Sequence, residues 1–321
     1  LALSLARAGH AVTLLCRSEE ECNTLRTERE NKRKLPGIKL PPALQFSADP
    51  AVALDGVNIV FFVVPSQSMR SNANALASYI AAGGVAVSAA KGLELGSHLR
   101  MSEILAQELG EKVEVAALSG PNLAQEIAEG HAATTVVAAS DIAVAERVQD
   151  VLISPHLRVY TNTDLIGVEL CGALKNVIAL GAGFADGLEA GDNAKSALIT
   201  RGLAEMARLG IAAGANVFTF AGLAGLGDVI ATCASRYSRN RFVGQELAKG
   251  RPLDEIRASL GHVAEGVTTT QVAVELAHAY NIEMPITEQL YAVLFEGKSP
   301  LAAISDLMSR DRKDEMSNLQ G

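Results

Sequence analysis

The chain has 321 residues, of which 49% are hydrophobic, 4% aromatic and 20% charged, and its formal net charge is -8. This length predicts two domains, and because tryptophan is absent, aliphatic side chains and alanine must fill their cores. The acidic balance excludes nucleic acid as the main partner, but a local cluster of positive charge is enough to bind a small anion.

The first predicted element is a short helix at the start of the sequence. Residues 1–8 are apolar and rich in alanine, and Gly9 closes them in the place where glycine is preferred at a helix C-terminus. A buried strand over residues 12–15 follows. A dinucleotide-binding fold opens with a strand, a G-x-G-x-x-G loop, a helix and a second strand. We therefore expect that the first strand and the glycine-rich loop belong before residue 1 and are missing from this chain.

Short β-branched runs then alternate with helical stretches. The sequence predicts strands over residues 58–64, 85–89, 113–118 and 134–138, a last strand near residues 158–160, and helices over residues 69–82 and 99–109. Such alternation is typical of βαβ units, which build a parallel sheet covered on both faces. We predict a Rossmann-like α/β domain over residues 1–162.

Arg17 lies just after the strand at residues 12–15. Enzymes specific for NAD carry Asp or Glu at this place for the ribose 2′-hydroxyl, whereas a cation can pair with the 2′-phosphate of NADP. An ordinary solvated loop arginine explains the residue equally well.

Three segments fall where ligands bind in open α/β sheets, beyond the carboxyl ends of the strands. They are residues 63–65 (VVP), 91–92 (KG) and 119–122 (SGPN). Each alone is compatible with ordinary loop chemistry, but together on one edge they indicate a site. Lys91 is the most informative, because a cation there favours a phosphate or a polarised carbonyl, and free N–H groups of the SGPN turn could hold an oxygen anion.

The second half, residues 163–321, is predicted to be an all-helical domain. Residues 164–188 are apolar nearly all round, which is typical of a buried helix, and their glycines indicate close backbone approach. Lys175 is an uncompensated cation within this segment. Burial would lower its pKa and suit it to proton transfer near neutral pH, although a lysine can instead extend its amine to the surface.

The segment at residues 222–244 is the other unusual stretch of the helical half. Its glycines lead into Asp228, which is expected to cap the next helix, and residues 235–238 interrupt that helix. Ser238, Arg239 and Asn240 then open a further helix with groups that suit an oxyanion. The alternative is a helix–turn–helix connection with surface arginines.

Four separated cysteines form no C-x-x-C pair, so we expect reduced thiols, no metal site and a cytoplasmic location. The longest apolar runs are shorter than the ~20 residues of a membrane helix, so stable membrane insertion is not expected. No signal peptide is visible.

With these motifs in place, the chain resembles the bacterial NAD(P)-dependent glycerol-3-phosphate dehydrogenases from residue 1 to about residue 310. KGLE at Lys91, SGPN at Ser119, GALKN at Gly172, GLAGLGD…SRNR from Gly222 and VAEGV at Val263 carry the resemblance in the family's order. It implies interconversion of sn-glycerol 3-phosphate and dihydroxyacetone phosphate with NAD or NADP, and a supply of glycerol phosphate for phospholipid synthesis. A homodimer is left open.

The resemblance also implies roles for individual residues. Lys175 would exchange the proton on the C2 oxygen of the substrate, supported by Asp228. The residues implied around the substrate are Lys91, Gly120, Asn122, Lys175, Asp228, Ser238, Arg239 and Asn240. Those implied around the dinucleotide are Arg17, Lys91, Ala124, Arg239, Val263 and Glu265. Asn122 stands where the family commonly has threonine or serine, and its amide can still donate to a substrate.

Two other functions are compatible with parts of this pattern. A related dehydrogenase could act on a hydroxy acid or a sugar phosphate, but the SRNR segment favours a phosphate monoester. A non-catalytic dinucleotide-binding protein is disfavoured by Lys175, because such a protein gains nothing from burying an amine.

Overall fold

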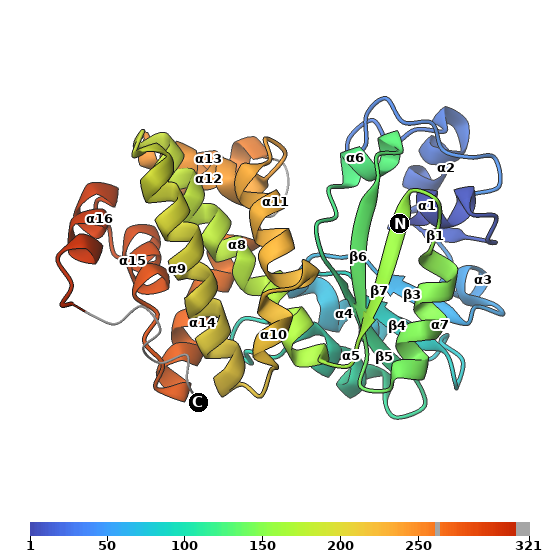
Figure 1. The fold of residues 1–321 in the computed structure, drawn as a ribbon. Helices are drawn as coiled ribbons and strands as arrows, with labels where there is room; N and C mark the ends of the chain where they lie inside the picture. Colours follow the sequence, from blue (N-terminus) through green and yellow to red (C-terminus); the bar gives the residue numbers. More distant parts are fainter. Residues whose placement is uncertain (261–263, 313–321) are drawn as a thin grey trace.

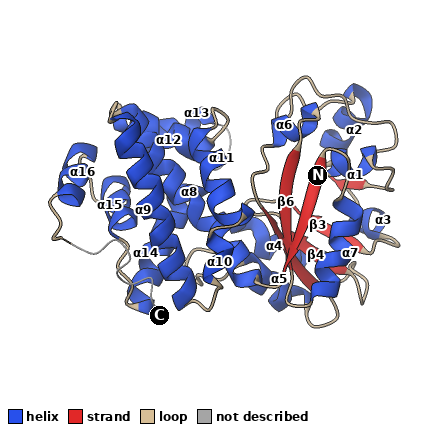
Figure 2. Ribbon diagram, in the orientation of Figure 1, coloured by secondary structure: helices blue, strands red, loops and turns tan. Residues whose placement is uncertain are grey.

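The computed structural model describes residues 1–260 and 264–312. The first half of the chain forms strands with helices on their faces, and the described part of the second half is built of helices, as Figure 1 shows. Every strand within the described residues lies in the first half (Figure 2). This arrangement confirms the predicted fold class, a Rossmann-like half followed by a helical half.

The strands form two separate sheets. A parallel pair joins β1 (Thr13–Leu15) to β2 (Gln45–Ser47), and a five-stranded sheet has the order β3-β4-β5-β6-β7. Its strands are β3 (Ile59–Phe62), β4 (Val85–Ser88), β5 (Glu114–Ser119), β6 (Ala133–Ala138) and β7 (Leu157–Asn162). The sequence predicted all of these except β2. It also predicted a wholly parallel sheet, which is wrong at one place, because β6 runs antiparallel to β5.

Helices cover both faces of the larger sheet because alternate residues of its strands point to opposite sides. Val85 and Val87 of β4 pack into the cluster beneath α7, while Ala86 between them packs into the cluster beneath α4 and α5. The helices of this half are α1 (Ala2–Arg7), α2 (Glu19–Glu28), α3 (Pro50–Leu54), α4 (Met69–Leu76), α5 (Met101–Leu109), α6 (Ala124–Glu129) and α7 (Ile142–Leu152). The predicted helices at residues 69–82 and 99–109 correspond to α4 and α5.

The helical half is organised around one buried helix, α8 (Leu165–Gly187), which Asp164 begins by accepting the N–H of Gly167 at 2.9 Å. The helices around it are α9 (Gly191–Ala212), α10 (Val217–Phe220), α11 (Asp228–Ala234), α12 (Arg239–Ala248), α13 (Leu253–Leu260), α14 (Glu265–Tyr280), α15 (Pro285–Phe295) and α16 (Pro300–Met308). A Cβ on Gly183 would lie 2.0 Å from the Arg241 carbonyl oxygen. The predicted close backbone approach is thus present, and it packs α8 against α12.

Two helical segments, Leu165–Gly187 and Val217–Ala234, are long and apolar enough to cross a membrane by length and composition alone. The sequence analysis had found no uninterrupted apolar run of that length. These two segments reach it because each may include isolated charged residues. In α8, 83% of the most apolar stretch is buried inside the protein, against 44% for the second segment. The character of α8 is therefore accounted for by its place in the core.

Candidate active site

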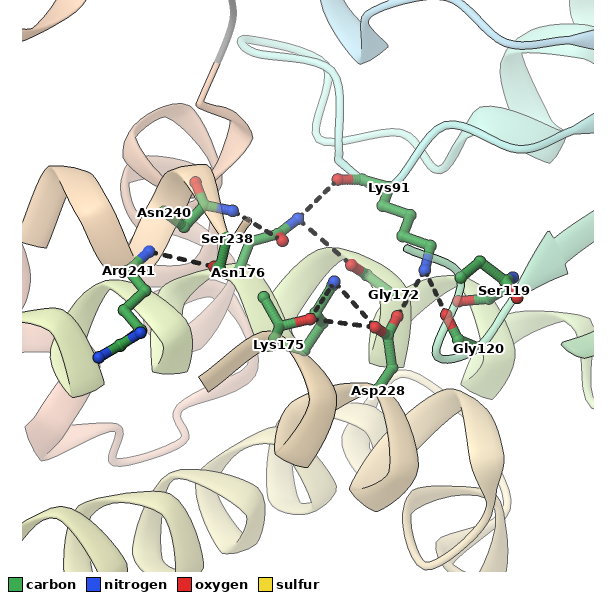
Figure 3. Close-up of polar contacts among 12 residues, drawn as sticks. Lys91, Ser119, Gly120, Gly172, Lys175, Asn176, Asp228, Ser238, Asn240 and Arg241 are labelled. Atoms are coloured by element: carbon green, nitrogen blue, oxygen red, sulfur yellow. Dashed lines mark hydrogen bonds and ion pairs between the residues drawn. The ribbon is translucent and has the colours of Figure 1, made fainter. Parts of the chain in front are cut away.

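Lys175 lies on α8, and only 7% of it is exposed. Its Nζ donates to Oδ1 of Asp228 at 3.0 Å and to Oγ1 of Thr232 at 2.6 Å (Figure 3). The amine therefore does not extend to the surface. The sequence had suggested that the charge of Lys175 is uncompensated. This is wrong, because Asp228 pairs with Lys175 inside the protein.

Asp228 joins two lysines that come from different halves of the chain. Its other oxygen, Oδ2, accepts from Lys91 Nζ at 2.5 Å, and the same Nζ donates to the Gly120 carbonyl oxygen at 2.7 Å. Lys91 follows β4 and Gly120 follows β5, while Asp228 begins α11. One carboxylate thus holds two ammonium groups at the junction of the sheet with the helices (Figure 3).

The environment of this cluster lowers the pKa of both Lys175 and Asp228, for different reasons. Burial and, to a lesser extent, the positive charge of Lys91 lower the pKa of Lys175, Asp228 opposes both, and the resulting pKa is about 8. Burial alone would raise the pKa of Asp228, but the positive charges of Lys91 and Lys175 outweigh the effect of burial. The pKa of Asp228 therefore lies below its usual value. Asp228 is therefore an anion at neutral pH, and Lys175 can give up and regain a proton close to neutrality.

The expectation that Asp228 caps a helix is wrong. A π-helical turn at Leu223–Gly227 leads directly into α11, and Asp228 is the first residue of that helix rather than a side-chain cap. Its carboxylate is instead used by the two lysines. Thr232 lies four residues later on the same face and donates to Asp228 Oδ1 at 3.1 Å. Sequence reasoning missed Thr232, although its i,i+4 spacing from Asp228 is visible in the sequence.

The turn after β5 provides polar groups next to Lys91. Gly120 has a φ of +133°, and a Cβ there would lie 3.2 Å from Cα of Thr135. Asn122 donates from Nδ2 to Thr135 Oγ1 at 2.8 Å. Among the residues that the structure describes, Ser119 Oγ and Asn122 Oδ1 are buried without a hydrogen-bond partner. Two unsatisfied polar atoms at the carboxyl end of a strand fit a polar ligand.

The start of α12 forms as predicted, with Ser238 accepting the N–H of Arg241 at 3.3 Å. Asn240 is buried and links two helices: it donates to Asn176 Oδ1 at 2.8 Å and accepts from the N–H of Gly266 at 2.9 Å. Arg239, which lies between Ser238 and Asn240 in the sequence, is exposed. The structure thus buries Ser238 and joins Asn240 to Asn176 and Gly266, while Arg239 is exposed to solvent.

The residues implied for the dinucleotide fall on separate elements, and Glu265 lies beside the segment of Lys91, since a Cβ on Gly92 would lie 3.2 Å from Glu265 Oε2. Arg17, after β1, is largely exposed and pairs with Glu21 at 3.1 Å, and Ala124 is the exposed first residue of α6. Glu265 begins α14 and accepts from the N–H and the Oγ of Ser66 at 3.0 and 2.5 Å. Val263 lies outside the described residues. Sequence reasoning missed Ser66, which lies just after the strand-ending Pro65.

Two features bear on other kinds of site. Within residues 1–260 and 264–312, no group of three or more His, Cys, Asp or Glu could hold a metal ion. A cavity of about 360 Å³ lies between α9, α15 and α16, and none of its lining residues belongs to the lysine cluster. The chemistry that the geometry supports is therefore proton transfer by Lys175, assisted by Asp228 and Lys91.

Comparison with known proteins assigns this architecture to a family. The model for the NAD-dependent glycerol-3-phosphate dehydrogenase N-terminus matches residues 1–145, and the model for the C-terminus of the same family matches residues 164–305. A glycerol-3-phosphate dehydrogenase [NAD(P)+] of Desulfitobacterium hafniense is 50% identical over 98% of this chain and 89% of its own. That of Geobacillus kaustophilus is 50% identical over 99% and 93%. The crystal structure of glycerol-3-phosphate dehydrogenase from Coxiella burnetii superimposes with a TM-score of 0.92 at 38% identity, covering 97% of this chain and 95% of that one.

Proposed function

Because the chain belongs to the NAD-dependent glycerol-3-phosphate dehydrogenase family, we propose that it interconverts sn-glycerol 3-phosphate and dihydroxyacetone phosphate with NAD or NADP. The observation that carries this proposal is the pair of lysines, buried Lys175 and partly buried Lys91, that share Asp228 at the carboxyl edge of the sheet. That edge is where ligands bind in folds of this class. We further propose that the dinucleotide-binding half comprises residues 1–162 and the catalytic half residues 163–321.

Lys175 supplies the proton in this proposal. Reduction of a ketone creates an alkoxide, and an ammonium beside it both stabilises the negative charge and donates the proton. The pKa of Lys175, lowered by burial and by Lys91 to about 8, lets the amine return to its charged form between turnovers. Asp228 holds the ammonium of Lys175 in place, and Thr232 accepts its second hydrogen bond.

The substrate phosphate is expected at the start of α12. Ser238, Arg239 and Asn240 offer a hydroxyl, a guanidinium and an amide at a helix N-terminus, which together favour an oxyanion. The phosphate does not react, so contacts to it give affinity that can be used to hold the carbonyl in place. Lys91, Gly120 and Asn122 complete the proposed substrate contacts.

NAD or NADP, when bound, supplies or accepts the hydride. The residues present fit such a group, because Ser119 Oγ and Asn122 Oδ1 are buried without partners at the sheet edge and Arg17 presents an exposed cation beyond β1. The residues that would hold it are Arg17, Lys91, Ala124, Arg239, Val263 and Glu265. We propose that the enzyme works in the cytoplasm without stable membrane insertion and supplies phospholipid synthesis.

The test is oxidation of NADH and NADPH by the purified protein, followed by the absorbance of the reduced nicotinamide. Dihydroxyacetone phosphate should be reduced, while a panel of 2-oxo acids, the ketone forms of 2-hydroxy acids, should not. Turnover of a 2-oxo acid with no turnover of dihydroxyacetone phosphate would contradict the proposal and favour a related dehydrogenase.

A further inference from the structure

Lys91 is carried by a short hairpin that runs from the sheet to the helical half. In this Lys91 hairpin (residues 91–102), Leu93 pairs with Arg100 as an antiparallel bridge, and the N–H of Glu94 donates to the Leu99 carbonyl oxygen at 3.0 Å. Leu93 is 1% exposed and packs into the main core of the helical half. The position of Arg100 on one arm therefore fixes the position of Leu93, two residues after Lys91, on the other.

One stripe of α8 faces this hairpin along its length. Glu169, Gly172 and Asn176 have the spacing i, i+3 and i+7, which places them on one side of a helix. Asn176 donates to the Lys91 carbonyl oxygen at 2.9 Å, and a Cβ on Gly172 would lie 3.5 Å from Cγ of Lys91. Gly172 thus allows Lys91 to lie close to the backbone of α8. Asn176 on one side of Gly172 contacts the arm that carries Lys91, and Glu169 on the other side contacts the arm that carries Arg100.

Glu169 makes the contacts at the far end of the hairpin. Its carboxylate accepts from Arg100 Nη1 at 2.7 Å, from the N–H of Ser102 at 2.8 Å and from Ser102 Oγ at 2.5 Å. Its side chain is 7% exposed, so these bonds are not weakened by water. The N–H of Ser102 is one of the free donors of the first turn of α5, where a carboxylate is favoured. Burial raises the pKa of Glu169, while Arg100 and Ser102 oppose that shift. Through its contacts with Arg100 and Ser102, this one buried carboxyl group of α8 fixes both the end of the hairpin and the start of α5.

We propose that Glu169 is a positioning residue for Lys91. Through Arg100 and the bridge to Leu93, it holds the hairpin so that Lys91 Nζ lies between the Gly120 carbonyl and Asp228. The inference rests on the function proposed above, in which Lys91 acts on the substrate and on the charge of Lys175. It assigns a role in the reaction to a side chain that reaches neither substrate nor cofactor.

Glu169→Gln tests this role, because it keeps the shape of the side chain while removing the charge that Arg100 and Ser102 use. The first readout is reductive methylation by formaldehyde and a borane, with Lys91 resolved by peptide mass spectrometry in the absence of substrate and cofactor. Loss of a charge-assisted hydrogen bond should free Lys91 and raise its methylation rate about tenfold. Should Glu169→Gln fail to fold, Ser102→Ala removes one of the same bonds and should raise the rate in the same direction.

The second readout is the pH profile of kcat/KM for reduction of dihydroxyacetone phosphate. The charge of Lys91 lowers the pKa of Lys175, so a displaced Lys91 should move the alkaline limb to higher pH by about one pH unit. A change that merely loosened the fold would not move this limb. Glu205→Gln is the matched control, because Glu205 is likewise a buried carboxyl that accepts from N–H groups and a hydroxyl at the start of a helix, those of Ile286 and Thr287 in α15. It makes no contact with the Lys91 hairpin that would alter either readout.

The two readouts separate this inference from the proposed function. Faster methylation of Lys91 in Glu169→Gln supports the positioning role even if the protein does not reduce dihydroxyacetone phosphate, an outcome that would overturn the proposed function alone. A folded Glu169→Gln protein with the methylation rate and the alkaline limb of the parent chain would overturn the positioning role.

Discussion

Replacement of Lys175 by methionine removes the charge of the proposed proton donor and nearly preserves its length. Loss of one partner from a buried ion pair commonly costs about 3–5 kcal/mol, because the other charge is left alone. Here Asp228 keeps Lys91 at 2.5 Å and Thr232 at 3.1 Å, so the carboxylate stays paired. We therefore expect a smaller loss, about 1–3 kcal/mol, and a folded protein. Loss of general acid catalysis is worth about 10²–10⁴ in rate, so kcat should fall at least about a hundredfold.

The assay compares kcat for dihydroxyacetone phosphate with NADH affinity from fluorescence titration and with the unfolding midpoint. NADH affinity should be unchanged, since Lys175 is assigned to the substrate alone. Lys195→Met is the matched control. Lys195 of α9 pairs with Asp186 of α8 at 2.7 Å, outside the cluster of Lys91, Lys175 and Asp228, and its loss should leave kcat unchanged. Near-normal turnover by a folded Lys175→Met protein would refute the assignment, and the proton would have to come from another group.

Three further predictions concern pH, cofactor choice and backbone geometry. The ammonium form of Lys175 donates the proton and its pKa is lowered to about 8, so kcat/KM for ketone reduction should fall above pH 8. The value of kcat/KM for oxidation of glycerol 3-phosphate should rise over the same range. The prediction is contradicted if the two pH profiles do not mirror each other. Arg17→Ala should raise KM for NADPH more than for NADH, and equal changes would show that Arg17 is an ordinary loop residue. Gly120→Ala should cost about 1–3 kcal/mol in urea unfolding, because φ is +133° and Thr135 leaves no room for a Cβ; an unchanged midpoint would argue against a strained turn.

Local patterns were sufficient to predict most of the fold. The apolar run at residues 164–188 became α8, and the β-branched runs became β3 to β7. Two features were missed for physical reasons. β2 consists of Gln45–Ser47 alone, too short to show alternation, and its register is set by pairing with β1. The antiparallel direction of β6 depends on how the chain returns to the sheet, which no local propensity encodes.

The candidate site was predicted as separate motifs, but not as contacts. Lys91 and Lys175 were identified from their places at a strand end and in an apolar helix. The resemblance implied that Asp228 supports Lys175, but that Asp228 also binds Lys91 could not be predicted, because these two residues are 137 apart in the sequence. Glu169 illustrates a signal that was present: it is a charge in the same apolar helix as Lys175, and the argument that a buried charge needs a partner applies equally to both.

The arrangement of two lysines on one carboxylate makes the acidity of the proton donor depend on contact between the two halves of the chain. Lys175 and Asp228 belong to the helical half, and their pairing alone would raise the pKa of the amine. Burial lowers the pKa of Lys175 most. Lys91, which comes from the sheet half and binds the second oxygen of Asp228, lowers it further by its positive charge. Seating of the Lys91 hairpin on α8 therefore lowers the pKa of Lys175 beyond what burial alone does. This coupling explains why positioning side chains such as Glu169 can influence a proton transfer that they do not touch.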